Sequence, residues 1–211
     1  MILLESIFSN DYTPFDNDES EMTLILGARC IDGVVLIGDR RVTQTLSSGP
    51  RYVYEDKITG EIDGILTGFA GDQGAFEVFR TKLRVYVTTK IREDEKNVGH
   101  ALDQLKLKIS EIQYDFYSKY QQRPYRVLMG ASSKYFASQK SSLYLYETDG
   151  RCFPQNETLP VAIGSGSSHI LYFLKRYWNP NKTTMNEFAQ LGDFLIRYVS
   201  DDKITSIMVW D

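Results

Sequence analysis

The sequence predicts an α+β fold in which two largely antiparallel β-sheets are stacked between two layers of helices. Three observations support this four-layer αββα sandwich. Strand and helix patterns alternate in blocks, which argues against a parallel sheet with one crossover helix per strand. The helical patterns come in sequential pairs, and turn signals separate consecutive strands. The 211 residues are 42% hydrophobic, enough for one domain with a substantial core.

The first block of the predicted fold contains four strands. Their apolar and β-branched stretches are Thr23–Cys30, Val34–Asp39, Arg51–Ile58 and Gly64–Phe69. The dipeptide Asp32-Gly33 lies between the first two, and it favours a tight hairpin because both residues tolerate positive φ. The turn between the other two strands is expected at Gly60–Asp63.

Two helices, three strands, two helices and a final strand are expected to follow. Apolar residues recur at helical spacing from Gln73 to about Ile91 and from Val98 to Phe116. The second helix must end before Arg123-Pro124, because proline disfavours helical geometry in the residue before it. The later strands are predicted at Tyr125–Ala131, Ser141–Glu147, Pro160–Ile163 and Thr205–Trp210, and the later helices at Ser168–Tyr177 and Thr184–Val199.

Composition excludes several classes of protein. A net charge of −4 argues against a general nucleic-acid binder, which carries a basic stripe. No apolar run is long enough to span a membrane. The cysteines Cys30 and Cys152 form no CxxC pair, which favours a reduced, cytoplasmic compartment. The histidines His100 and His169 are isolated, so no metal and no cofactor are expected.

Charge is unevenly distributed along the chain. Residues 1–22 contain six acidic residues and no Lys or Arg. They immediately precede the apolar strand that begins at Thr23. We interpret residues 1–22 as an acidic leader or propeptide, and residues 23–211 as a single domain that begins at a threonine.

The motifs of this domain resemble a known family. The run TLILGARCIDGVVLIGDRRVT, which begins at Thr23, is followed by DKI, TGFAGD and GSGS. Together these motifs resemble the proteasome β-type subunits, threonine proteases of the N-terminal nucleophile (Ntn) hydrolases. In that family the mature chain starts with threonine, has glycine four residues on, turns at a short acidic hairpin and continues into an acid-x-Arg signature. Thr23, Gly27, Asp32-Gly33 and Asp39-Arg40-Arg41 match without a gap. The α-type subunits carry a Tyr-Asp-Arg motif that residues 1–22 lack.

The resemblance implies a catalytic set of Thr23, Asp39, Lys57, Gly68 and Ser165. A threonine hydroxyl is a weak nucleophile, and the α-amine of an N-terminal threonine, with a pKa of about 8, can act as its base. Lys57 matches the family's lysine beside the nucleophile, and Asp39 would orient it. Gly68 matches the glycine whose N–H binds the oxyanion. Ser165 matches the serine that helps to move the proton.

The resemblance also implies a substrate pocket with walls formed by Val42, Leu66 and Ala70. The apolar side chains of Val42 and Leu66 favour an apolar substrate residue. Glu55, if it also lines the pocket, favours a basic one. The sequence leaves both specificities open.

The function implied is a threonine endopeptidase that hydrolyses unfolded proteins. It would act in a cytoplasmic homo- or hetero-oligomeric ring with α-type subunits, without nucleic acid or membrane, after cleavage between Met22 and Thr23. Family members that process themselves have glycine before the threonine. Met22 therefore leaves open a catalytically silent structural subunit, and a stand-alone Ntn amidohydrolase or transpeptidase is the other alternative. The candidates for the family's late Asp and Ser are Ser200, Asp201 and Ser206.

Overall fold

The structure is a computed structural model that describes residues 23–47, 49–62, 64–89, 98–119, 125–133, 140–155, 159–200 and 205–210. The predicted leader, residues 1–22, lies outside this part of the chain. The elements of the described part are β1 (Ile25–Cys30), β2 (Gly33–Asp39), β3 (Arg41–Leu46), β4 (Gly49–Tyr54), β5 (Ile58–Ile62), β6 (Ile65–Gly71), α1 (Gln73–Thr89), α2 (Val98–Lys119), β7 (Tyr125–Ala131), β8 (Ser142–Tyr146), β9 (Cys152–Pro154), β10 (Val161–Ile163), α3 (Ser167–Tyr177), α4 (Met185–Ser200) and β11 (Thr205–Trp210).

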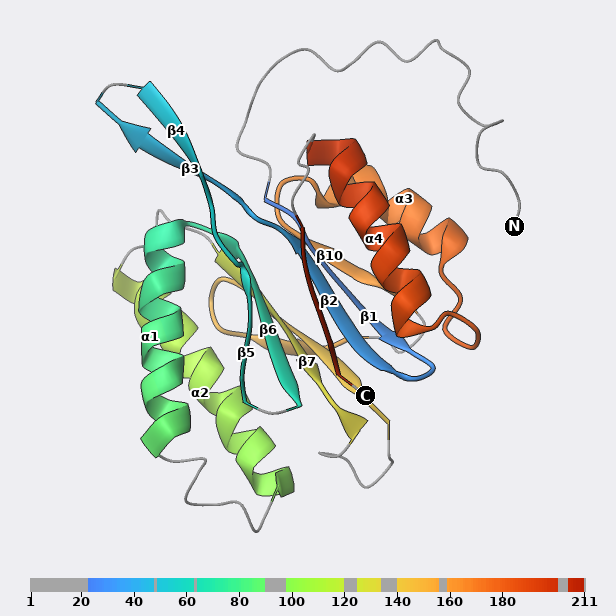
Figure 1. Cartoon of the computed structure of the whole chain (residues 1–211). Coiled ribbons are helices and arrows are strands. Elements are labelled where there is room, and N and C mark those ends of the chain that lie inside the picture. Colours follow the sequence, from blue (N-terminus) through green and yellow to red (C-terminus); the bar gives the residue numbers. More distant parts are fainter. Residues whose placement is uncertain are drawn as a thin grey trace.

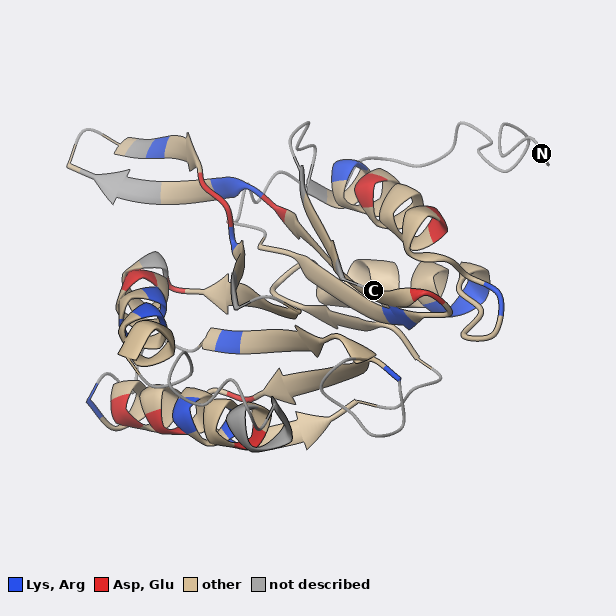
Figure 2. Cartoon of the chain, turned by 60° about the horizontal axis from the view of Figure 1, so that its bottom comes forward, with Lys and Arg blue, Asp and Glu red and all other residues tan. Residues whose placement is uncertain are grey.

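The predicted four-layer architecture is confirmed. One sheet has the strand order β10-β1-β2-β11 and the other β5-β6-β7-β8-β9, with antiparallel pairing throughout. Helices α1 and α2 cover the outer face of the five-stranded sheet, and α3 and α4 cover the outer face of the four-stranded sheet (Figure 1). Charged residues lie mainly on the helices, while the stacked sheets are largely uncharged (Figure 2).

Alternation along single strands places the core between the layers. In β6, Ile65 and Phe69 pack with the apolar residues of α1 and α2. Leu66 and Ala70, on the opposite face of the same strand, belong to the cluster between the two sheets. A strand buried on both faces has this pattern because successive side chains point to opposite sides. A third cluster fills the space between the four-stranded sheet and α3 and α4.

The first hairpin forms as predicted, but its turn lies one residue earlier. Cys30 pairs with Gly33, so Ile31 and Asp32 form the connection and Gly33 begins β2. The expectation of an Asp32-Gly33 turn was therefore wrong. The segment before α4 accounts for the shift: Ile31 N donates to Thr183 O at 3.2 Å, and Met185 N donates to Asp32 Oδ1 at 2.7 Å. Asp32 thereby satisfies a backbone donor at the start of α4.

The region between β2 and β6 differs most from the prediction. The single strand predicted at Arg51–Ile58 is two strands, β4 and β5, separated by residues 55–57. The turn predicted at Gly60–Asp63 is also wrong, because β5 continues to Ile62. An additional strand, β3, pairs with β4 as a two-stranded ribbon that projects from the sheets (Figure 1). The break at residues 55–57 allows one segment to belong first to the ribbon and then to the sheet.

The other elements agree with the prediction to within a few residues. β9, at Cys152–Pro154, was not predicted, because three residues at a sheet edge give too short a pattern for recognition. Helix α4 begins with a capping box in which Thr184 N donates to Glu187 Oε2 and Glu187 N donates to Thr184 Oγ1.

Candidate active site

Four of the five predicted catalytic residues, Thr23, Asp39, Lys57 and Ser165, contact one another at one end of the stacked sheets. Thr23 precedes β1 and Asp39 ends β2, both in the four-stranded sheet. Lys57 directly precedes β5 of the five-stranded sheet. Ser165 lies between β10 and α3. Residues far apart in sequence thus meet because both sheets, and the connection into α3, end at this point.

The backbone of Thr23 is held by the segment that precedes α3. Thr23 N donates to Ser165 Oγ at 3.2 Å, and Gly166 N approaches Thr23 O at 3.5 Å. Gly164 lies under the same carbonyl: its φ is +103°, and a Cβ there would come within 1.9 Å of Thr23 O. Only glycine fits this position, both for its backbone conformation and for the close approach. The GSGS motif therefore holds the backbone of Thr23 through Gly164, Ser165 and Gly166.

Lys57 provides the positive charge beside Thr23. Its Nζ donates to Asp39 Oδ2 and to Arg41 O, each at 2.5 Å, and lies 3.5 Å from Thr23 Oγ1. The side chain of Lys57 is 7% exposed and that of Asp39 is fully buried. An ammonium in such surroundings favours negative charge on a neighbouring oxygen, and water screens this effect little.

Asp39 also holds the residue after the candidate nucleophile. Leu24 N donates to Asp39 Oδ1 at 2.6 Å, and Asp39 N donates to Leu24 O at 3.1 Å. One carboxylate therefore contacts Lys57 with one oxygen and the start of β1 with the other. Because Leu24 is bonded to Thr23, the carboxylate fixes the relative position of the threonine and the ammonium.

Gly68 lies in β6 opposite Ile58, one residue from Lys57 on the paired strand. Phe69 N donates to Lys57 O at 2.9 Å, which fixes β6 against the segment that carries the lysine. A Cβ on Gly68 would come within 2.7 Å of Ile25 Cγ2. Packing between the sheets therefore favours glycine here, separately from the oxyanion role that the sequence resemblance implies.

The predicted pocket residues fall into two groups. Leu66 and Ala70 are buried in the cluster between the sheets. Val42 lies in β3, where it pairs with Val53 in the projecting ribbon and is half-buried. Glu55 lies at the base of the same ribbon, and its N donates to Arg40 O. A shared pocket for Val42, Leu66 and Ala70 stays a prediction.

Two features of the site were not identified from the sequence. Gly164 was read only as part of GSGS, although its steric role can be recognised once Thr23 is placed beside it. Arg41 was part of the acid-x-Arg signature, and it is its backbone carbonyl that accepts from Lys57. Because every residue has a backbone carbonyl, the sequence does not show which carbonyl accepts a hydrogen bond. Of the late candidates, Ser200 ends α4 and Ser206 pairs with Gly38, whereas Asp201 lies outside the described residues.

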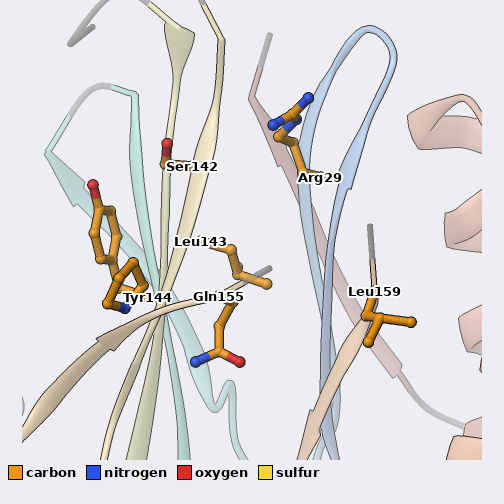
Figure 3. Close-up of a pocket in the computed structure, with 7 residues that line it drawn as sticks. Arg29, Ser142, Leu143, Tyr144, Gln155 and Leu159 are labelled. Carbon is orange, nitrogen blue, oxygen red and sulfur yellow. The ribbon is translucent and has the colours of Figure 1, made fainter. Parts of the chain in front are cut away.

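A cavity of about 110 Å³ lies elsewhere, where β1 and β8 approach each other (Figure 3). Its lining includes Arg29 near the end of β1 opposite Thr23, and Ser142 and Tyr144 of β8. None of the five catalytic candidates lines it. In the described part of the chain, no group of three or more His, Cys, Asp or Glu residues lies close enough to hold a metal ion. No helix in that part is long and apolar enough to cross a membrane.

Comparisons with known proteins agree with the fold. Among solved structures, Anbu (ancestral beta-subunit) from Yersinia bercovieri is similar with a TM-score of 0.71 and 11% sequence identity, over 89% of this chain and 81% of that chain. This likeness shows the fold alone. No curated protein gives a significant sequence match. The family model described as proteasome subunit matches residues 21–208, which is most of the sequence. The chain therefore belongs to the proteasome subunit family.

Proposed function

We propose that the chain is a threonine endopeptidase subunit of the proteasome β type, with Thr23 as the nucleophile after residues 1–22 are removed. The observation that carries this proposal is the convergence of two groups on one threonine. Lys57 Nζ lies 3.5 Å from Thr23 Oγ1, and Ser165 Oγ lies 3.2 Å from Thr23 N. An N-terminal threonine nucleophile needs its hydroxyl to lie close to a base, which is the nitrogen of the same residue, and a nearby ammonium favours the deprotonated hydroxyl. The contacts of Thr23 with Lys57 and Ser165 support this arrangement.

The proposed reaction is acyl transfer in two steps. The freed amine of Thr23 takes the proton of Oγ1. The Oγ1 atom then attacks the carbonyl carbon of a peptide bond. The ammonium of Lys57 stabilises the developing alkoxide, and the N–H of Gly68 binds the oxyanion of the tetrahedral intermediate. The proton passes to the leaving amine, with Ser165 assisting, and leaves an ester on Oγ1. Water then hydrolyses the ester and restores the threonine.

The proposed substrates are unfolded polypeptides, and the proposed setting is a cytoplasmic oligomer. Members of the proteasome subunit family assemble into rings, which supports an oligomer of this chain in general. A ring shared with α-type subunits belongs to the proposal. Val42, Leu66 and Ala70 are the proposed walls of the pocket for the substrate side chain.

The test is intact mass and N-terminal sequencing of the purified full chain, together with cleavage of fluorogenic peptides. We expect the wild-type chain to begin at Thr23 and to cleave peptides. Thr23→Ala should keep residues 1–22 and show no cleavage. The matched control is Thr88→Ala, which removes an exposed threonine hydroxyl in α1 and should behave as the wild type. Equal peptide cleavage by wild type and Thr23→Ala would overturn the proposal.

A second function is favoured by one specific observation. Met22 stands where self-processing relatives have glycine, so the chain is also a candidate for a silent structural subunit. In that case the leader would persist at every protein concentration, the chain would assemble, and no peptide would be cleaved. The same measurements therefore separate the two functions, provided that the mass of the assembly is determined alongside.

A further inference from the structure

The segments that carry Asp39 and Lys57 both leave their strands beside the site. β2 ends at Asp39 and β3 begins at Arg41, so Arg40 lies in neither strand. On the other segment, residues 55–57 lie between β4 and β5. The projecting ribbon and the stacked sheets therefore meet at a break in the regular ladder. The lysine of the site lies within this break.

Two contacts bridge the break. Glu55 N donates to Arg40 O at 2.9 Å. Arg40 Nε lies 3.0 Å from Asp56 Oδ1, with 33% of the arginine side chain and 56% of the aspartate side chain exposed. The Nε atom of Arg40 is buried, and within the described part of the chain it makes no hydrogen bond. Its contact with Asp56 is therefore an ion pair in which the N–H does not point at the carboxylate oxygen.

This outer ion pair runs alongside the inner pair of the site. Arg40 directly follows Asp39, and Asp56 directly precedes Lys57. Lys57 Nζ also donates to Arg41 O, the carbonyl on the other side of Arg40. Two of the three oxygens around Nζ therefore belong to the segment that Arg40 connects to Asp56. A shift of one segment along the other would move both oxygens relative to the ammonium.

We propose that Arg40 and Asp56 are positioning residues, whose ion pair holds the two segments in the alignment that keeps Lys57 Nζ beside Asp39, Arg41 O and Thr23 Oγ1. The catalytic consequence of this clamp rests on the proposed function, whereas its geometric consequence does not. Exposed ion pairs contribute little to folding stability, so variants that lack this pair are expected to stay folded. Displacement of a catalytic group by about 1 Å is enough to reduce a rate roughly 100-fold.

The first test measures Lys57 directly and needs no activity. The full chain carrying Thr23→Ala is labelled with trace acetic anhydride across pH, and the acetylation rate of each lysine is read by mass spectrometry. We expect Arg40→Ala and Asp56→Ala each to raise the labelling rate of Lys57 at least threefold, because the loosened segment exposes its amine. The exposed lysines Lys82 and Lys108 serve as internal standards and should not change.

The matched control is Arg126→Ala. Arg126 Nε forms a cross-segment ion pair with Glu147 Oε2 at 2.8 Å, between β7 and the residue after β8. Arg126 pairs with Ala70 of β6 and does not belong to the two segments that carry Asp39 and Lys57. In this variant we expect Lys57 to be acetylated at the same rate as in the Thr23→Ala chain. Unchanged Lys57 labelling in both Arg40→Ala and Asp56→Ala, with the chain folded by circular dichroism, would overturn the proposal.

The second test uses peptide cleavage in the chain with its native Thr23. Arg40→Ala and Asp56→Ala should each lower kcat at least tenfold with KM unchanged, and the double variant should be no worse than either single variant. Arg40→Lys, which keeps the charge, should recover part of kcat. If no variant, including the wild type, cleaves peptides while Lys57 labelling still responds, the proposed function fails and the clamp is supported. Normal cleavage by both single variants contradicts the clamp and leaves the proposed function intact.

Discussion

Lys57 Nζ lies 2.5 Å from Asp39 Oδ2, and this buried ion pair connects the four-stranded sheet to the segment that leads into the five-stranded sheet. A charge pair removed from water is stable only when each charge keeps its partner and its hydrogen bonds. Here the carboxylate also accepts from Leu24 N, and the ammonium also donates to Arg41 O. The same contacts therefore serve the packing of the sheets and the position of the candidate nucleophile.

The first prediction is that removal of one charge destabilises the fold more than removal of both. Lys57→Met should lower the free energy of unfolding by about 3–5 kcal/mol, because it leaves the Asp39 carboxylate buried without its cation. Adding Asp39→Asn should recover part of this loss. Urea denaturation followed by circular dichroism measures the stability of both variants. In the exposed pair of Lys108 with Glu111, Lys108→Met should change stability by less than about 1 kcal/mol. Equal effects at Lys57 and Lys108 would contradict this interpretation.

The second prediction concerns the close contact between Gly164 and the carbonyl of Thr23. Gly164→Ala forces a side chain into a backbone conformation that favours glycine and into contact with Thr23 O. Gly49 is the matched control, because its φ is +113° but a Cβ there meets nothing within 4 Å. Gly49→Ala should cost about 1–3 kcal/mol from backbone strain. Gly164→Ala should cost about 1–3 kcal/mol more from the steric clash. Thermal unfolding of both variants measures the difference, and equal losses would show that the contact with Thr23 is not tight.

The third prediction separates packing from catalysis at Gly68. Gly68→Ala keeps the backbone N–H but places a methyl group 2.7 Å from Ile25 Cγ2. We expect a loss of stability of about 1–3 kcal/mol from overpacking, together with a loss of peptide cleavage. Ile25→Ala in the same chain removes the opposing methyl group and should restore a large part of the cleavage. Activity that stays lost in a stable double variant would mean that residue 68 needs glycine for a reason other than this contact.

The prediction from sequence succeeded where local pattern and local structure agree. Apolar alternation and helical spacing identified α1 and β7 because their burial follows the period of a single element. The break at residues 55–57 was missed because Arg51–Ile58 reads as one continuous strand. Only contacts with residues 39–41, far away in sequence, divide it between the ribbon and the sheet.

The candidate site shows the same limit. Lys57 and Asp39 were assigned through motif spacing, and their contact is consistent with that assignment. Gly164 and the carbonyl of Arg41 act through backbone atoms, and the sequence does not specify a backbone contact until the chain is folded.

The fourth prediction concerns the thiol of Cys30, far from the site. Burial, together with the nearby carboxylates of Asp32 and Glu187, raises the pKa of Cys30 from 9.0 to about 12. Because the folded state favours the protonated thiol, this stabilising contribution is complete below pH 9.0 and is lost as the pH rises toward about 12. The Cys30 thiol should therefore react with a disulfide reagent at pH 8 only after unfolding in urea. Mass spectrometry of the labelled peptide checks this, and fast reaction in the folded chain would contradict it.

The last prediction addresses the residue before the candidate nucleophile. Cleavage between Met22 and Thr23 requires Thr23 Oγ1 to attack the carbonyl of Met22, and glycine at that position gives the backbone more freedom to form the tight turn. Met22→Gly should therefore speed removal of residues 1–22 at least tenfold, measured by intact mass over time. Met22→Ala, which shortens the side chain without comparable backbone freedom, is the control and should give a smaller increase. If Met22→Gly leaves the leader in place while Lys57 and Thr23 are intact, self-processing does not occur at this bond, and the structural subunit becomes the better interpretation.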